Sequence, residues 1–147
     1  SIDMKKVYPV IFTDVSTNIL IEVPDLKILT EANEEGKEKA SFAEAIIIAR
    51  DAIGLSCISA EDEGKAIAEA SAIEDIDVNK GTFAAEGKGL VSLVDVDLAE
   101  YRRKVDNKTV RRNVTLPNWL NQAAEAANLN VSRVLQEALM EKLDVRR

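Results

Sequence analysis

The sequence has no histidine, and this absence excludes more chemistry than any other feature of its 147 residues. Histidine is the commonest general base and the commonest metal ligand near neutral pH. Its absence argues against catalytic triads, zinc hydrolases and metal-sensing regulators. A single cysteine, Cys57, excludes an intramolecular disulfide and suits a reducing cytoplasm, which is where we expect the protein to act.

Long apolar runs are also missing. The longest, such as AIIIA at residues 45–49, are far shorter than the roughly 20 residues that cross a bilayer. We therefore expect no association with a membrane. Hydrophobic residues make up 46% of the chain and charged residues 31%, a balance typical of a globular protein. The length allows one ordinary domain or two small ones.

Charge is distributed unevenly along the chain, whose formal net charge is −7. From Lys104 onward there are eight basic and five acidic residues, whereas residues 1–103 carry 11 basic and 21 acidic ones. Such asymmetry predicts two modules with different partners. The basic end suits a polyanion and the acidic end suits a basic protein, although an acidic surplus also serves solubility alone.

The N-terminal part predicts an α+β domain with one sheet and a helix on one of its faces. Strands of alternating apolar residues are expected at 8–14 and 18–25, joined by a hairpin, with a third at about 28–32. Because proline cannot donate a ladder hydrogen bond, Pro9 and Pro24 are expected at strand ends or on an edge.

The helix of this domain has a clear start signal, a capping box formed by Ser41 and Glu44. Its apolar stripe runs through Phe42, Ala45, Ile46, Ala49 and Ile53, and Gly64 is expected to end it. The run Ile46–Ile48 belongs either to the core or to a subunit contact. An irregular crossing at 65–88, a strand at 90–97 and a short helix at 98–104 complete the predicted order.

The C-terminal part begins with VRRNVTLP, residues 110–117, after a predicted linker at 105–109. Val114 and Leu116 alternate with polar residues, which predicts a strand. Pro117 suits the first turn of a helix reaching residue 128, where Asn128 can adopt a left-handed conformation. Asn130 then suits the N-cap of a second helix, which ends near Leu143.

One strand and two helices are too small to bury a core, and a lone strand leaves its backbone groups unpaired. We therefore predict that a second copy of the chain supplies an antiparallel strand and two further helices. The outward faces of the two strands then form a ribbon that fits the major groove of B-DNA, about 12 Å wide.

This pattern resembles the ribbon-helix-helix DNA-binding domain. The resemblance implies that Arg111, Asn113 and Thr115 read base edges, although they also suit a solvated strand face. Arg112 takes an inward position, so it lies at a frayed strand edge or reaches a phosphate. Lys108 and Arg133 are further candidate DNA contacts. The amides of Val131, Ser132 and Arg133 would hold a phosphate at the helix N-terminus.

The similarity extends over nearly the whole chain from Met4. The succession of YPVIF, VPDL, SFAEAIIIARDAIGL, VDVDLAEYRRK and VRRNVTLPNWL is similar to that of the HicB antitoxins. This resemblance implies a partial ribonuclease-H-like domain at 4–104, which binds and blocks a HicA-type toxin that cleaves messenger RNA. It further implies a DNA-binding domain at 105–147 that represses the shared operon, in a homodimer or a tetramer of paired dimers.

Two other functions remain open. One is a ribbon-helix-helix transcriptional regulator whose N-terminal domain senses a small molecule. The other is a nuclease with a two-metal site built from the carboxylates Asp14, Glu22, Asp25, Asp95 and Asp97. We favour turn and strand-face roles for these carboxylates, and packing roles for Cys57 and Trp119. We accordingly expect no catalytic residue, no metal and no cofactor.

Overall fold

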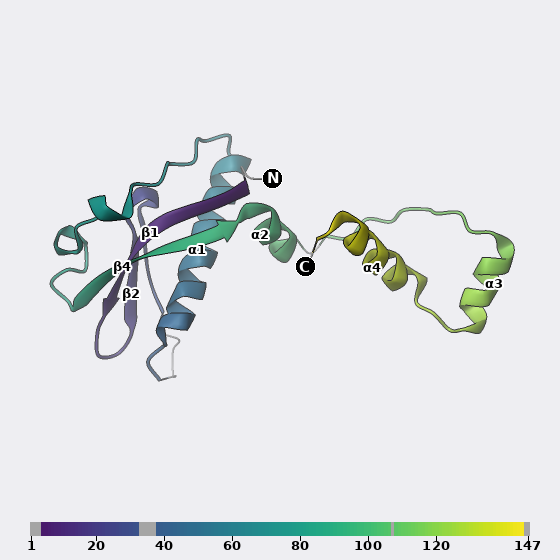
Figure 1. The fold of residues 1–147 in the computed structure, drawn as a ribbon, viewed down its shortest axis with the longest axis horizontal. Coiled ribbons are helices and arrows are strands. Elements are labelled where there is room, and N and C mark those ends of the chain that lie inside the picture. The colour runs from purple at the N-terminus through teal and green to yellow at the C-terminus, as the bar shows by residue number, and fades with distance from the viewer. Residues whose placement is uncertain (1–3, 33–37, 107, 146–147) are drawn as a thin grey trace. The chain divides into compact units, whose positions relative to one another are not determined.

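The computed structural model describes residues 4–32, 38–106 and 108–145, so Asn107 of the predicted linker lies outside the described residues. The chain divides into two compact units, Ser1–Arg102 and Arg103–Arg147. The first unit contains a sheet packed against one helix, a short helix spans the boundary between the units, and the second unit contains two further helices (Figure 1).

The first unit is built on a four-stranded antiparallel sheet with the strand order β3-β2-β1-β4. Its strands are β1 (Lys5–Asp14), β2 (Ile19–Val23), β3 (Ile28–Glu31) and β4 (Lys88–Asp97). All four strands were predicted, and together with the helices they confirm the α+β class. The ribonuclease-H-like architecture stays a prediction.

The β1–β2 hairpin determines which residues of β1 form hydrogen bonds with β2 and which form them with β4. Val15 N donates to Asn18 O at 3.1 Å and closes the β1–β2 hairpin. In an antiparallel pair, successive residues point their N–H and C=O groups to opposite sides. Odd-numbered residues of β1 therefore bond toward β2, and even-numbered ones bond toward β4.

Pro9 lies inside this central strand rather than at an end or on an edge, which corrects the prediction. The reason is the same alternation. Pro9 is an odd-numbered residue, so its missing N–H faces the β2 side, but β2 pairs only with residues from Ile11 to Asp14. No ladder hydrogen bond is lost at Pro9. Pro24 directly follows β2, in the short helical turn η2 (Pro24–Leu26), as predicted.

The core lies between the sheet and the helix α1 (Phe42–Asp62). Ser41 Oγ accepts a hydrogen bond from Glu44 N at 3.2 Å, which confirms the N-cap. The helix buries Ala45, Ala49, Ile53 and Cys57 against apolar strand residues, namely Tyr8, Val10, Phe12, Ile19, Ile21 and Val23. Burial raises the pKa of the Cys57 thiol, so this side chain packs as a neutral thiol, as expected.

Residues 65–87, here called the crossing segment, connect α1 to β4 through the short helical turns η3 (Ile73–Asp75) and η4 (Val78–Lys80). None of these residues is buried. Ile67 packs against the core, and side chains of β1, β2 and η2 form hydrogen bonds with the segment. Tyr8 Oη donates to Ala68 O at 2.6 Å, Asp25 accepts from Ser71, and Glu22 accepts from Thr82.

The helix α2 (Leu98–Val105) follows β4 without a break and packs Tyr101 against Gly54 of α1. A Cβ atom at position 54 would lie 2.8 Å from two ring carbons of Tyr101. The glycine therefore allows the close approach of the two helices. Burial, with a smaller effect from Asp51, raises the pKa of Tyr101 to about 12.

We predict that Gly54→Ala destabilises the protein by about 1–3 kcal/mol, because the buried Tyr101 ring must move to relieve the overlap. Thermal and denaturant unfolding would measure the loss. In a Tyr101→Ala background the same substitution should instead stabilise by up to about 1 kcal/mol, because alanine favours helix more than glycine. A loss of equal size in both backgrounds would contradict the contact.

Candidate functional site

The second unit contains the helices α3 (Asn118–Ala126) and α4 (Val131–Leu143), each close to its predicted range. Asn130 Oδ1 accepts from Arg133 N at 3.1 Å, and Asn128 has φ 55°, so both cap predictions are confirmed. Pro117 is the N-cap of α3 rather than a member of its first turn, because its carbonyl accepts from Leu120 N and Asn121 N.

The predicted strand at 110–117 is not formed in the single chain: residues 108–116 have no regular secondary structure. A strand exists only through hydrogen bonds to a neighbour, and the described part of the second unit contains no other strand. The alternation of Val114 and Leu116 with polar residues therefore has no ladder in one chain. Pairing with a second copy stays a prediction.

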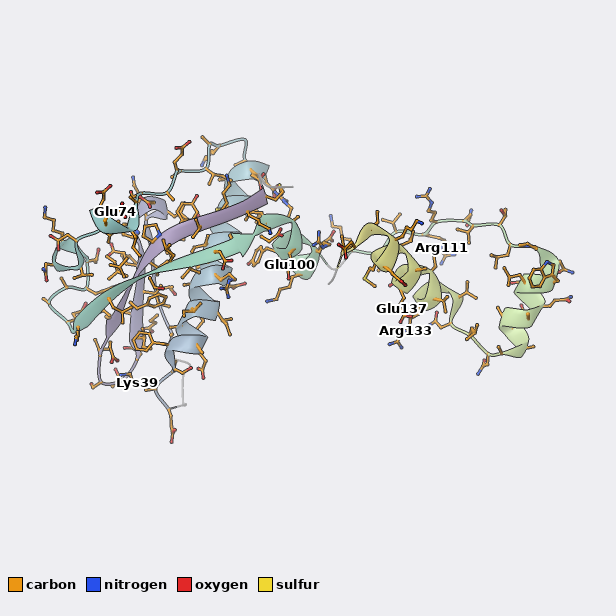
Figure 2. All side chains as sticks on the ribbon, in the orientation of Figure 1. Lys39, Glu74, Glu100, Arg111, Arg133 and Glu137 are labelled. Atoms are coloured by element: carbon orange, nitrogen blue, oxygen red, sulfur yellow. The ribbon has the colours of Figure 1, made fainter. Side chains whose placement is uncertain are left out.

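All of the predicted DNA-contacting residues are exposed: Lys108, Arg111, Arg112, Asn113, Thr115, Val131, Ser132 and Arg133. The first five lie on the segment before α3, and the last three form the first turn of α4. Figure 2 shows Arg133 beside Glu137 on α4, and Arg133 Nε donates to Glu137 at 3.3 Å. Such an exposed pair is weak, so the Arg133 side chain can exchange this contact for a phosphate.

The predicted phosphate site at the start of α4 needs one correction. The Arg133 amide already donates to the Asn130 side chain, which is the capping interaction itself. Only the amides of Val131 and Ser132 are left for an anion, because one N–H group cannot serve both partners well. The candidate site is therefore two amides with the Arg133 side chain beside them.

No described residue of the second unit, from 103 to 145, is buried. Its helices and the preceding segment expose large apolar side chains, here called the apolar surface: Val110, Val114, Leu116, Trp119, Leu120, Leu129, Val131, Val134, Leu135, Leu139 and Leu143. Trp119 is 69% exposed, so its predicted packing role is not seen in the single chain. So many exposed large apolar side chains in a unit without a core favour association with a partner.

The five carboxylates considered for a metal site are engaged separately. Asp14 pairs with Lys39, Glu22 binds Thr82, and Asp25 binds Ser71. Asp95 pairs with Arg50, and Asp97 caps α2 by accepting from Glu100 N at 3.1 Å. Among the described residues no group of histidine, cysteine or carboxylate side chains has the arrangement of a metal site. In the structure these five carboxylates therefore have roles in turns, in a helix cap and in side-chain contacts of the sheet.

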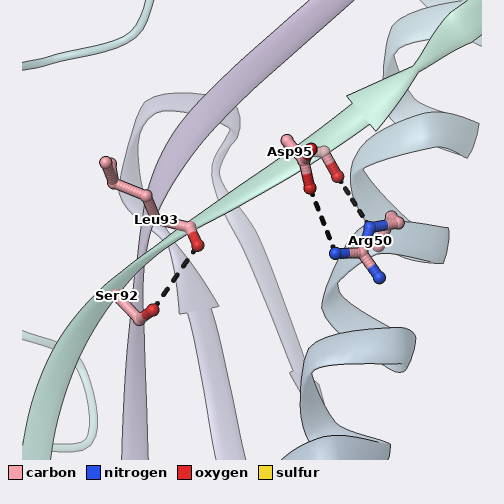
Figure 3. Close-up of polar contacts among 4 residues, drawn as sticks. All are labelled: Arg50, Ser92, Leu93 and Asp95. Carbon is pink, nitrogen blue, oxygen red and sulfur yellow. Dashed lines mark hydrogen bonds and ion pairs between the residues drawn. The ribbon is translucent and has the colours of Figure 1, made fainter.

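The outer edge of β4 is a feature that the residue pattern does not predict. Arg50 of α1 reaches it and donates to Asp95 O at 2.8 Å and to Asp95 Oδ1 at 3.1 Å (Figure 3). These residues are 45 positions apart, and only the strand order places them together. Arg50 thereby satisfies one backbone carbonyl of an edge strand.

Comparison with known proteins relates both units to a solved structure. No family model and no curated protein matches the chain. The fold is similar to that of a chain in a toxin-antitoxin complex from Streptococcus pneumoniae, with a TM-score of 0.55 and 20% sequence identity. The match covers 95% of this chain and 99% of that chain. In the described part of the chain, no helix has the length and apolar character needed to cross a membrane.

We predict that the fluorescence of Trp119, the only tryptophan, depends on protein concentration. A second copy covering the apolar surface would move this ring out of water, so emission should shift to longer wavelength as the protein is diluted. Sedimentation over the same concentrations would report the mass. Leu135→Glu should abolish the dependence and keep the emission at long wavelength; an unchanged spectrum in both proteins would contradict the prediction.

Proposed function

We propose that the chain is a HicB-type antitoxin, which binds and blocks a small HicA-type toxin that cleaves messenger RNA and represses the operon encoding both. The observation that carries this proposal is the fold likeness over 95% of the chain to a chain of a toxin-antitoxin complex. The succession of motifs from YPVIF to VRRNVTLPNWL supports the HicB assignment. The separation into two units supports a division of labour between toxin and DNA.

Toxin inhibition in this proposal is non-catalytic. The first unit has a complete core and a surface rich in carboxylates, and residues 1–103 have a net charge of −10. A basic toxin is attracted by this field, which accelerates encounter and disfavours wrong partners. Once bound, the unit occludes the surface that the toxin needs for RNA. No chemical step by this chain is required.

DNA binding in this proposal requires a second copy. The apolar surface of one second unit covers that of the other, and residues 110–116 of the two copies pair as an antiparallel ribbon. Arg111, Asn113 and Thr115 then project from one face of the ribbon into the major groove. Arginine pairs with guanine O6 and N7, and asparagine pairs with adenine N6 and N7. The amides of Val131 and Ser132 bind a phosphate of the DNA backbone, which fixes the position of the ribbon along the groove.

The direct test is calorimetric titration of the full chain with the catalytically inactivated product of the small gene beside its own. Tight binding that weakens only modestly with salt would support the antitoxin function, because a buried interface is screened less than a purely electrostatic one. Absence of binding would overturn it and leave a DNA-binding regulator whose first unit has another ligand.

We predict that Arg111→Ala or Asn113→Ala weakens operator binding by about 1–3 kcal/mol for each lost bidentate pair, and relaxes specificity at one base pair. Gel-shift or anisotropy titrations on the operator and its single-base variants would measure this.

Lys108→Ala is the matched control, since a phosphate contact carries no sequence information. It should weaken binding to all sequences alike and reduce the salt slope by about one. Toxin affinity should not change in any of these variants. Parallel losses of operator and toxin binding would contradict the division into two functional units.

A further inference from the structure

The outer edge of β4 exposes backbone hydrogen-bonding groups that no other strand of the described chain pairs. Odd-numbered residues of β1 bond toward β2, and they stand opposite odd-numbered residues of β4, such as Pro9 opposite Leu93. The odd-numbered residues of β4 therefore point their N–H and C=O groups away from β1, toward the outside of the sheet. The contact of Arg50 with Asp95 O agrees with this direction.

This edge lacks most of the features that prevent strand addition. β4 has ten residues, whereas β3 on the opposite edge has four. Proteins usually protect edge strands with proline, lysine, bulges or short length. Here Arg50 satisfies Asp95 O, and Ser92 Oγ makes only a long 3.4 Å contact with Leu93 O (Figure 3). The groups of Gly89, Val91 and Leu93 are thus accessible to a further strand.

Apolar side chains flank the accessible stretch on both faces of the sheet. Leu93 is 52% exposed on the face opposite α1, and Leu90, on the α1 face, is also exposed. The helix α1 runs alongside β4 in the same direction, since Phe42 contacts the Phe12 ring opposite Leu90 and Arg50 contacts Asp95. A strand added here would find apolar partners for the side chains on both of its faces.

The negative charge of this part of the chain favours a strand from a basic protein over a strand from a second copy of the chain. A second copy would bring the net charge of −10 of its residues 1–103 to the same interface, and like charges oppose such pairing. A basic protein is attracted instead. We propose that the basic toxin adds a β-strand to the outer edge of β4, between Gly89 and Leu93. This inference rests on the proposed antitoxin function and names the surface that performs it.

Strand addition gives the short edge between Gly89 and Leu93 a way to bind the toxin with high affinity. Backbone hydrogen bonds supply affinity in this mode, and the side-chain pockets beside alternate residues supply specificity. The added strand ends before Asp95, because the Arg50 guanidinium already donates a hydrogen bond to the Asp95 carbonyl. At the other end, Lys88 begins β4.

The first experiment compares Leu93→Lys with Leu29→Lys, using calorimetry with the inactivated toxin and the full-length chain. The two leucines are 52% and 54% exposed, lie on the two edge strands of one sheet, and face the same side of it. The substitutions add the same charge, so long-range repulsion of a basic partner affects both alike. We expect affinity to fall by about tenfold or more for Leu93→Lys and to change little for Leu29→Lys.

The second experiment measures amide hydrogen exchange of wild-type protein with and without the toxin. Outward amides of Val91 and Leu93 should exchange quickly in the free chain and slowly in the complex. The amides of Ser92 and Val94 face β1, so they should be protected in both states and serve as internal controls. A contact through side chains alone would not produce this alternation.

The outcomes separate this inference from the proposed function. If the toxin binds both lysine variants equally and the outward amides stay unprotected, the edge proposal is overturned while the antitoxin function stands. If wild-type protein does not bind the toxin, both fall. If the outward amides are protected in the free chain and Leu93→Lys alone lowers its mass in sedimentation, a second copy occupies the edge and the proposal is overturned.

Discussion

The central strand β1 must satisfy backbone groups on two sides, and the first unit depends on this constraint. Its odd-numbered residues bond toward β2 and its even-numbered residues toward β4, as the hairpin contact of Val15 with Asn18 requires. The same register lets a proline occupy position 9 of an internal strand. It also turns the backbone groups of Leu93 outward. A tolerated proline and an accessible edge thus have one cause.

The two units solve the problem of apolar burial in opposite ways. The first encloses a continuous core between the sheet and α1, so it is complete as one chain. The second has no buried residue in its described part and presents its apolar side chains to solvent. A folded unit can meet a partner protein directly, whereas a unit without a core must first associate. In the proposed function, toxin binding and DNA binding therefore depend differently on protein concentration.

Features encoded by near neighbours could be predicted from the sequence. The alternation of Tyr8, Val10 and Phe12 identified a strand, although residues 8–13 are buried on both faces, and the caps at Ser41 and Asn130 identified helix starts. Each of these signals lies within a few residues. The contacts of Arg50 with Asp95 and of Asp25 with Ser71 could not be predicted, because they join residues about 45 positions apart. The strand order could not either, because β1 and β4 are still further apart in the sequence. The predicted strand at 110–117 is absent from the single chain, because a strand needs a partner that the described part of the second unit does not contain.

The first unit does not depend on an unbroken chain through the crossing segment. This segment connects α1 to β4 with no fully buried side chain: Ile67 packs against the core near its start, and hydrogen bonds to Tyr8, Glu22 and Asp25 hold the rest. β4 is held independently, by pairing along its full length with β1. A chain cleaved in this segment would keep its two fragments assembled through that ladder. The segment is therefore a natural place to split the protein into two complementing pieces or to insert another domain.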